Sequence, residues 1–269
     1  MDKINEGVKL EMLLKNKIAI VTGASQGIGK AIAKKFSEHG AITILCSRNI
    51  EKLKIVSEEI KKSTGNKTVV IGVDVSKKDE VDNVIKKVVE LFSRIDILVN
   101  NASIQEFAPF LEMEEDFWDR HFDINVKGTF LFSQAVAKVM INKGGCRIIK
   151  LSSDSGVAPI PPKETAAYCA TKSAIIGLTR CIAKELGRYN IYCNAICPGA
   201  IFDTGMYEHY ANTEGVGKGR LQLDIDATAL GRIGYSKDVA DVALFFASDL
   251  SNFITGERLL VTGGDTMTQ

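Results

Sequence analysis

Two residues in the segment YCATK have the types and spacing of an acid–base pair. Tyr168 and Lys172 are four positions apart in a stretch whose apolar pattern predicts a helix, so their side chains share one face. A free phenol has a pKa near ~10 and carries protons poorly at neutral pH, and a nearby ammonium lowers that pKa. Such pairs are common on helix surfaces, but here a hydroxyl cluster precedes the pair: Ser152, Ser153 and Ser155. We therefore consider Tyr168 a candidate for proton transfer.

A glycine-rich turn near the start of the chain has the pattern of a phosphate site. TGASQGIG (22–29) lies between an apolar run typical of a strand and an amphipathic run typical of a helix. In this context Gly23 allows a tight turn, Gly27 lets the backbone approach a pyrophosphate, and Gly29 lets the helix pack on the strand. The amides and dipole of the helix N-terminus add to the attraction for an anion. A plain tight turn is the alternative.

The elements that must position these residues follow from an alternation of β-branched apolar runs with amphipathic runs. Strands are predicted over 18–22, 42–46, 68–75, 95–102, 146–153, 191–199 and 258–264. Helices are predicted over 27–40, 50–65, 79–95, 114–144, 165–189 and 238–248. This alternation gives right-handed crossovers and a parallel sheet covered on both faces. We expect an α/β protein with a single-domain Rossmann fold, a doubly wound parallel seven-stranded sheet with helices on both faces.

The domain is expected over residues 12–269, because MLLKNKIAIVTG reads as a complete domain start. Residues 1–11 are then a flexible N-terminal extension, or translation starts at Met12. The stretch 202–231 lacks clear periodicity, and its first part, about 202–224, is expected to be a substrate loop.

Composition excludes several classes of protein. Hydrophobic residues make up 45% and charged residues 25% of 269, and the net charge is +1, so no global field recruits nucleic acid or an anionic membrane. No apolar run approaches the ~20 residues that a membrane-spanning helix needs, and the charged N-terminus does not resemble a signal peptide. Six dispersed cysteines without CxxC pairs indicate reduced thiols, no metal site and a cytoplasmic setting.

The motifs, taken in order, resemble the short-chain dehydrogenase/reductase family. They are TGASQGIG, Asp74 in VDV, NNAS (100–103), Asn125 in DINVKGTF, SSDSG, YCATK, NAICPG and ITGERLLVTGG. The resemblance covers nearly everything from Lys15 to Met267, and the set is far more specific than any one motif. It implies a Rossmann-fold enzyme that transfers a hydride between a nicotinamide cofactor and a carbonyl or alcohol, closest to polyol, sugar and acetoin dehydrogenases and to 3-oxoacyl-carrier-protein reductases.

The resemblance assigns catalytic roles to four residues. Tyr168 exchanges a proton with the substrate oxygen, Lys172 lowers the pKa of Tyr168 and holds the nicotinamide ribose, and Asn125 supports a proton relay through water. A serine hydrogen-bonds the reacting oxygen. The family pattern Ser-Ser-x-x-Gly selects Ser153, whereas counting back from Tyr168 selects Ser155, because the gap is longer than usual. We favour Ser153, since the segment PIPPKET can absorb a short insertion, and Ser152 is expected to be structural.

The cofactor preference depends on the turn after the second strand. An acid there binds the ribose 2′-hydroxyl of NAD, and an arginine accepts the 2′-phosphate of NADP. This chain has Ser47 and Arg48 and no acid, which favours NADP(H), with NAD(H) as the alternative. By resemblance, Asp74 borders the adenine and Asn101 and Ala102 border the cofactor. The cofactor-binding set is Gly23, Ser25, Gln26, Gly27, Ile28, Gly29, Ser47, Arg48, Asp74, Val75, Asn101, Ala102, Tyr168, Lys172, Pro198, Gly199, Ile201 and Thr204.

The substrate is expected to be a small polar carbonyl or alcohol, bound by Ser153, Tyr168, Gln105 and Met206, with Ile104 and Val157 as further wall residues. Acyl-thioester reduction, as in 3-oxoacyl-carrier-protein reductases, is the alternative activity. A non-catalytic dinucleotide-binding regulatory protein is the alternative from another class, disfavoured by the complete catalytic set. The long helical stretches 115–142 and 166–188 carry apolar surface on more than one face, which by family resemblance indicates a homotetramer, with a dimer as the alternative.

Overall fold

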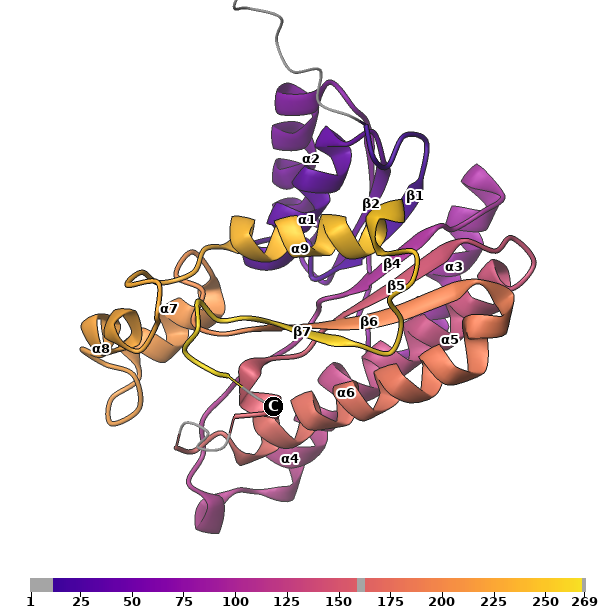
Figure 1. The fold of residues 1–269 in the computed structure, drawn as a ribbon. Helices are drawn as coiled ribbons and strands as arrows, with labels where there is room; N and C mark the ends of the chain where they lie inside the picture. The colour runs from indigo at the N-terminus through magenta and orange to yellow at the C-terminus, as the bar shows by residue number, and fades with distance from the viewer. Residues whose placement is uncertain (1–11, 159–162, 268–269) are drawn as a thin grey trace, which may run out of the picture.

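A computed structural model describes residues 12–158 and 163–267 and confirms the predicted sheet (Figure 1). Seven parallel strands lie in the order β3-β2-β1-β4-β5-β6-β7. Their bounds are β1 Ile18–Thr22, β2 Ile42–Ser47, β3 Thr68–Gly72, β4 Ile97–Asn100, β5 Cys146–Leu151, β6 Ile191–Pro198 and β7 Arg258–Val261. The order reverses between β1 and β4, which is the arrangement of a Rossmann fold and places a crevice at the carboxyl ends of these strands.

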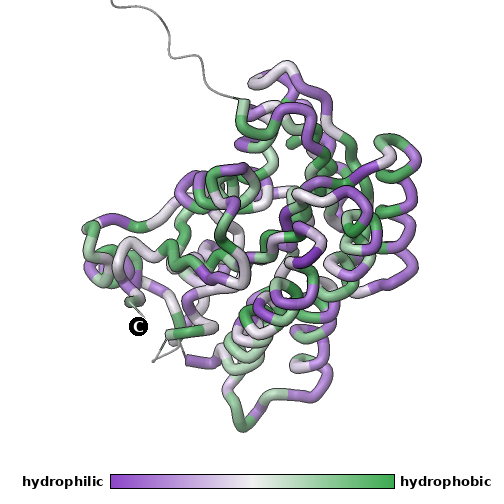
Figure 2. The backbone as a smooth tube through the Cα atoms, turned by 45° about the vertical axis from the view of Figure 1, so that its right-hand side comes forward, coloured by the Kyte–Doolittle hydropathy of each residue, from purple (hydrophilic) through white to green (hydrophobic). Residues whose placement is uncertain are grey.

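Helices cover both faces of the sheet, as predicted (Figure 1). Their bounds are α1 Gly27–Glu38, α2 Ile50–Thr64, α3 Lys78–Phe92, α4 Glu115–His121, α5 Gly128–Met140, α6 Ala166–Leu186, α7 Gly205–Asn212, α8 Leu221–Asp226 and α9 Ser236–Ala247. One core cluster joins the sheet to α1, α2 and α9, and a second joins the other face to α3, α5 and α6. Figure 2 shows hydrophobic segments in the strands and hydrophilic ones on the outer helix turns.

Two predicted segments differ from the structure. The stretch 202–231, expected to lack regular structure, contains the short helices α7 and α8. The predicted helix 114–144 is interrupted by a turn of π-helix over Phe122–Lys127, between α4 and α5. Neither feature has a periodic signal that can be detected over so few residues.

Some expectations fall outside the described residues. These are the extension 1–11, the PIPP part of PIPPKET (159–162) and the last two residues, 268 and 269. Within the described residues, no helix is both long and apolar enough to cross a bilayer.

Candidate active site

A cavity of about 1180 Å³ opens at the carboxyl edge of the sheet and collects almost all of the predicted site residues. Its walls come from the β1–α1 turn, the ends of β2, β4, β5 and β6, the start of α6, and α7 with α8. Catalytic candidates, cofactor candidates and substrate candidates therefore share one continuous space, of a size that suits a dinucleotide with a small substrate beside it. Among the predicted catalytic and cofactor-binding residues, Gly29 and Asn125 are not among the described lining residues.

The glycine-rich turn is built for close backbone approach. Gly23 has a φ of +66°, and a Cβ on Gly29 would lie 2.4 Å from the carbonyl oxygen of Gly23. Asn101 holds the turn from the end of β4, because its Nδ2 donates to the carbonyl oxygens of Thr22 at 3.0 Å and of Gly23 at 3.1 Å. Gln26 is the N-cap residue of α1, and in the described structure its side chain makes no capping hydrogen bond to the helix. The first amides of α1 thus keep donors for a phosphate, which fits a dinucleotide.

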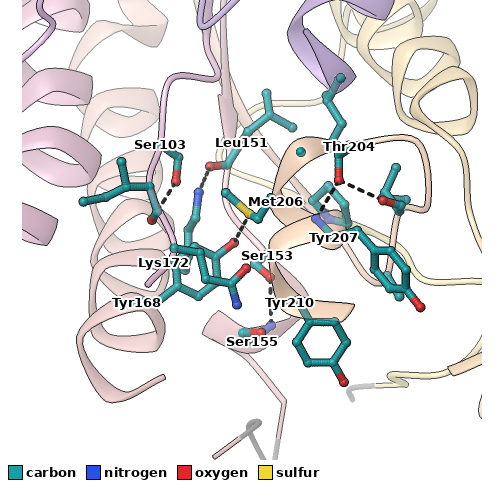
Figure 3. Close-up of a pocket in the computed structure, with 18 of the residues that line it drawn as sticks. Ser103, Leu151, Ser153, Ser155, Tyr168, Lys172, Thr204, Met206, Tyr207 and Tyr210 are labelled. Atoms are coloured by element: carbon teal, nitrogen blue, oxygen red, sulfur yellow. Dashed lines mark hydrogen bonds between the residues drawn. The ribbon is translucent and has the colours of Figure 1, made fainter. Parts of the chain in front are cut away.

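Tyr168 and Lys172 project from the first two turns of α6 into the cavity (Figure 3). The Nζ of Lys172 donates to the carbonyl oxygen of Leu151 at 2.9 Å and lies 5.3 Å from the centre of the Tyr168 ring. The hydroxyl of Tyr168 contacts the Sδ of Met206 at 3.7 Å. The helical spacing therefore brings the phenol and the ammonium to one wall, as predicted.

The expected lowering of the Tyr168 pKa is wrong for the chain by itself. Burial dominates at both residues: Tyr168 is 5% exposed and its pKa lies above the ordinary value, although a hydrogen bond from Ser153 lowers it in part. Lys172 is 2% exposed, and burial lowers its pKa to about 7. The physical reason is that removal of water disfavours the phenolate and the ammonium alike.

The three serines of SSDSG have different surroundings. Ser153 is buried, lines the cavity beside Tyr168, and donates to the Oδ1 of Asp154 at 2.8 Å. Ser155 lies farther along the turn, with its amide donating to the Oγ of Ser153 at 3.2 Å. Ser152 points to α6, where its Oγ donates to the carbonyl oxygen of Lys172 at 2.8 Å. All three serines line the cavity, but the hydroxyl of Ser152 is engaged with the backbone of α6, which leaves Ser153 as the favoured candidate for the hydroxyl beside the phenol.

Asn125 lies in the π-helical turn and is fully buried. Its side chain makes a reciprocal pair with the Ile104 backbone, accepting from the nitrogen at 2.9 Å and donating to the oxygen at 3.0 Å. It also donates to the Oγ1 of Thr171 at 3.1 Å, and its own carbonyl accepts from Thr129 at 2.7 Å. Asn125 therefore ties the segment after β4 to α6.

The segment after β6 reaches the glycine-rich turn. Pro198, Gly199, Ile201 and Thr204 line the cavity. Thr204 begins α7, where its Oγ1 accepts from the Tyr207 amide at 3.1 Å and donates to the Ile201 carbonyl at 2.9 Å. A Cβ on Gly27 would lie 3.2 Å from the Cγ2 of Thr204, so the two segments touch across the cavity.

Comparison with known proteins agrees with this geometry. The family model for short chain dehydrogenase matches residues 17–215. This chain belongs to the short-chain dehydrogenase family. It is 35% identical to an NAD-dependent glycerol dehydrogenase of Listeria innocua over 97% of this chain and 98% of the relative. It is 36% identical to a 3-oxoacyl-[acyl-carrier-protein] reductase of Thermotoga maritima, over 94% and 99%.

The structural neighbours of this short-chain dehydrogenase include a gluconate 5-dehydrogenase of Burkholderia cenocepacia in complex with NADP and tartrate. The two chains are 31% identical and superpose with a TM-score of 0.86 over 94% of this chain and 96% of the other. The chain is accordingly an NAD(P)-dependent oxidoreductase, and its cavity is the candidate site for such a cofactor.

A cation that was not predicted from the sequence lies beside the cavity, next to the lining residue Gln26. Ser47 and Arg48 line the cavity where β2 ends, facing Asp74 and Val75. Burial opposes ionisation of Asp74, but hydrogen bonds from Ser76 and the charge of Arg48 lower its pKa overall. Lys52, in the first turn of α2, donates from Nζ to the Oε1 of Gln26 at 3.4 Å.

The substrate end of the cavity combines the expected Gln105, Ile104 and Met206 with several residues that were not predicted. Val157, expected on the wall, is not among the described lining residues. The unpredicted residues are polar. The α7–α8 segment (205–226), called the lid below, contributes Tyr207, Tyr210, Arg220 and Asp224, and the other polar residues are Asp154 after β5, Lys163 before α6, and Asp265 and Thr266 in the C-terminal segment. Tyr207 donates to the Oδ2 of Asp224 at 2.9 Å and so joins α7 to α8. No sequence periodicity marks these residues, because they meet only through tertiary contacts.

Within the described ranges, no group of three or more His, Cys, Asp or Glu side chains is arranged so that it could hold a metal ion.

Proposed function

We propose that this short-chain dehydrogenase interconverts a small polar ketone or aldehyde and the corresponding alcohol, with NADP(H) as cofactor. The observation that carries the proposal is a single cavity wall on which Ser153, Tyr168 and Lys172 meet, continuous with the glycine-rich turn and Arg48. A protein that only bound the dinucleotide would not need this group of three beside the binding turn.

The cofactor supplies or accepts the hydride when it is bound. In reduction, the Tyr168 hydroxyl transfers its proton to the substrate oxygen, while the Ser153 hydroxyl hydrogen-bonds the same atom. The Lys172 ammonium, which bonds the Leu151 carbonyl at 2.9 Å, orients the ribose. Asn125 holds the segment after β4 against α6 and so fixes the floor of the site. In oxidation the same groups move the proton in reverse.

A preference for NADP(H) is supported by charge at the end of β2. Arg48 can bind a 2′-phosphate with two hydrogen bonds, and Ser47 adds a hydroxyl. Lys52 supplies a second cation next to Gln26, at 3.4 Å. The relative from Listeria innocua is named as NAD-dependent and the Burkholderia neighbour holds NADP, so proteins similar to this chain differ in their cofactor.

A small polar substrate is supported by the lining of the cavity beyond Tyr168. Tyr207, Tyr210 and Arg220 from the lid, with Gln105, offer hydrogen-bonding groups among the apolar residues that line the cavity. The alternative is a 3-oxoacyl thioester, because reductases of that kind are similarly close in sequence.

The assembly proposed is a homotetramer through α4, α5 and α6. Phe130 on α5 is 42% exposed in the single chain, as an interface residue would be. Light scattering on the purified protein tests this, and a monomer at micromolar concentration contradicts it. All six cysteines are free thiols, which suits the cytoplasm proposed from the sequence.

The test of function is a fluorescence titration with NADPH and NADH, followed by a panel of diketones, ketoses and acetoacetyl thioesters monitored at the nicotinamide absorbance. We expect tighter binding of NADPH and turnover of a polar carbonyl. Tyr168→Phe is expected to lose turnover and keep NADPH binding. Equal activity in Tyr168→Phe contradicts the catalytic assignment, and turnover of thioesters alone moves the proposal to its alternative.

A further inference from the structure

Asp154 follows Ser153 directly and lies in the cavity wall, yet none of the roles above uses it. Its Oδ1 accepts a hydrogen bond from the Ser153 hydroxyl at 2.8 Å and from the Ser155 amide at 2.6 Å. A short 3-10 turn over Asp154–Gly156 holds the carboxyl group in this position. The carboxyl group is thereby fixed against the hydroxyl that the proposed reaction needs.

The Ser153 hydroxyl has one proton, and more than one acceptor competes for it. In the structure the proton goes to Asp154, while the hydroxyl of Tyr168 donates to the Sδ of Met206. In the proposed reaction the carbonyl oxygen of the substrate is a further acceptor. A carboxylate is the strongest competitor, because a hydrogen bond to an ionised acceptor is about twice as strong as one between neutral groups. A protonated carboxyl group competes far less.

The surroundings of Asp154 favour its protonation. Burial and the charge of Asp265 raise its pKa, hydrogen bonds from Ser153 and Ser155 lower it, and the net effect is a raised pKa. Several titratable groups lie on the elements around Asp154. They are Tyr168, Cys169 and Lys172 on α6, Cys197 on β6, Lys163 in the segment before α6, and Asp265 in the C-terminal segment. The protonated form is thus reached at higher pH than for an exposed aspartate.

We propose that Asp154 is a positioning residue that decides whether the Ser153 proton is available to the substrate oxygen. As a carboxylate it retains that proton. When a proton from solvent in the cavity neutralises it, Ser153 donates to the carbonyl oxygen instead. Carbonyl reduction is therefore fastest below the pKa of Asp154. The link to turnover rests on the proposed function, but the contact between Asp154 and Ser153 does not.

A carbon NMR titration of the ligand-free full chain tests that contact without turnover. The protein is labelled with ¹³C at the aspartate carboxyl, and the Asp154 signal is the one lost in Asp154→Asn. We expect Ser153→Ala to raise the pKa of Asp154 by about one unit, because the carboxylate loses a charge-assisted hydrogen bond. Ser173→Ala is the matched control, since Ser173 donates to the Gly156 carbonyl at 2.8 Å in the same turn. An unchanged pKa in Ser153→Ala, or the same change in both variants, overturns the proposal.

The pH profile of kcat/KM for carbonyl reduction tests the role in turnover, using the ketone that the panel identifies. We expect the wild-type value to fall about tenfold per pH unit above the pKa of Asp154. Asp154→Asn is expected to lose this fall in kcat/KM at high pH, because an amide does not titrate. Asp265→Asn is expected to keep the fall but to shift it to lower pH, because Asp154 loses a repelling neighbour. A fall in Asp154→Asn at the same pH as in the wild type overturns the proposal. If no ketone is reduced, the proposed function fails by itself, and the NMR titration still decides whether Asp154 holds the Ser153 proton.

Discussion

Lys172 donates a 2.9 Å hydrogen bond from its ammonium to the carbonyl oxygen of Leu151, the last residue of β5. This bond fixes the start of α6 to the carboxyl edge of the sheet, where the candidate active site lies. It also holds a cation in a place with almost no water, at 2% exposure. Burial lowers the pKa of Lys172 to about 7. The buried ammonium therefore destabilises the ligand-free folded protein, although the proposed cofactor site needs its charge.

The destabilising effect of Lys172 predicts a pH dependence of stability. Its folded pKa is about 7 and its unfolded pKa is near 10.5, so between these values the unfolded chain binds more protons. The free energy of unfolding then rises with pH across this window, and below about pH 7 the buried ammonium has its full destabilising effect. We expect the free energy of unfolding of the wild type, relative to Lys172→Met, to increase from pH 7 to pH 10, by roughly 1.4 kcal/mol per unit of pKa shift at most. Urea titrations of both proteins measure this, and a constant difference contradicts it.

The choice of serine predicts opposite results for two neighbouring substitutions. Ser153→Ala removes the hydroxyl beside Tyr168 and is expected to lower kcat by about 10²–10³-fold, as for loss of one donor to a reacting oxygen. Ser155→Ala keeps the amide that bonds Asp154 and is expected to change kcat only a few-fold. Steady-state kinetics on the substrate found in the panel compares them. The reverse order would assign the role to Ser155.

Cofactor preference predicts a graded loss of affinity for NADPH. Arg48→Ala is expected to weaken NADPH binding by about 10–100-fold, since a bidentate contact to phosphate is lost, and Lys52→Ala by a smaller factor. NADH binding should hardly change in either variant, because NADH has no 2′-phosphate. Arg180→Ala, an exposed arginine on α6, is the matched control. Equal loss of affinity for both cofactors would show that Arg48 does not read the phosphate.

The glycine-rich turn predicts different tolerance at two helical glycines. A Cβ on Gly29 would lie 2.4 Å from the Gly23 oxygen, so Gly29→Ala is expected to destabilise the protein by about 1–3 kcal/mol and to weaken cofactor binding. A Cβ on Gly177, within α6, would have no described atom within 4 Å. Gly177→Ala is therefore expected to stabilise by up to about 1 kcal/mol. Thermal unfolding and NADPH titration measure both, and a neutral Gly29→Ala would contradict the close packing.

The sequence by itself determined the sheet, the helices on both faces and the order of the site motifs. This was so because each strand is a short continuous apolar run and each long helix has a clear period, and both are local properties. The glycines of 22–29 and the Tyr168–Lys172 pair were likewise readable, since their chemistry depends on spacing within one turn or one helix.

Tertiary structure alone decided the rest. It buried Tyr168 and Lys172 so far that loss of water, not their mutual charge, sets both pKa values. It buried Asn125 fully, joined α7 to α8 through Tyr207, and brought Asp265 of the C-terminal segment into the same cavity as Asp154. These relationships join residues distant in the chain, and desolvation depends on everything packed around a group, so no local pattern in the sequence carries them.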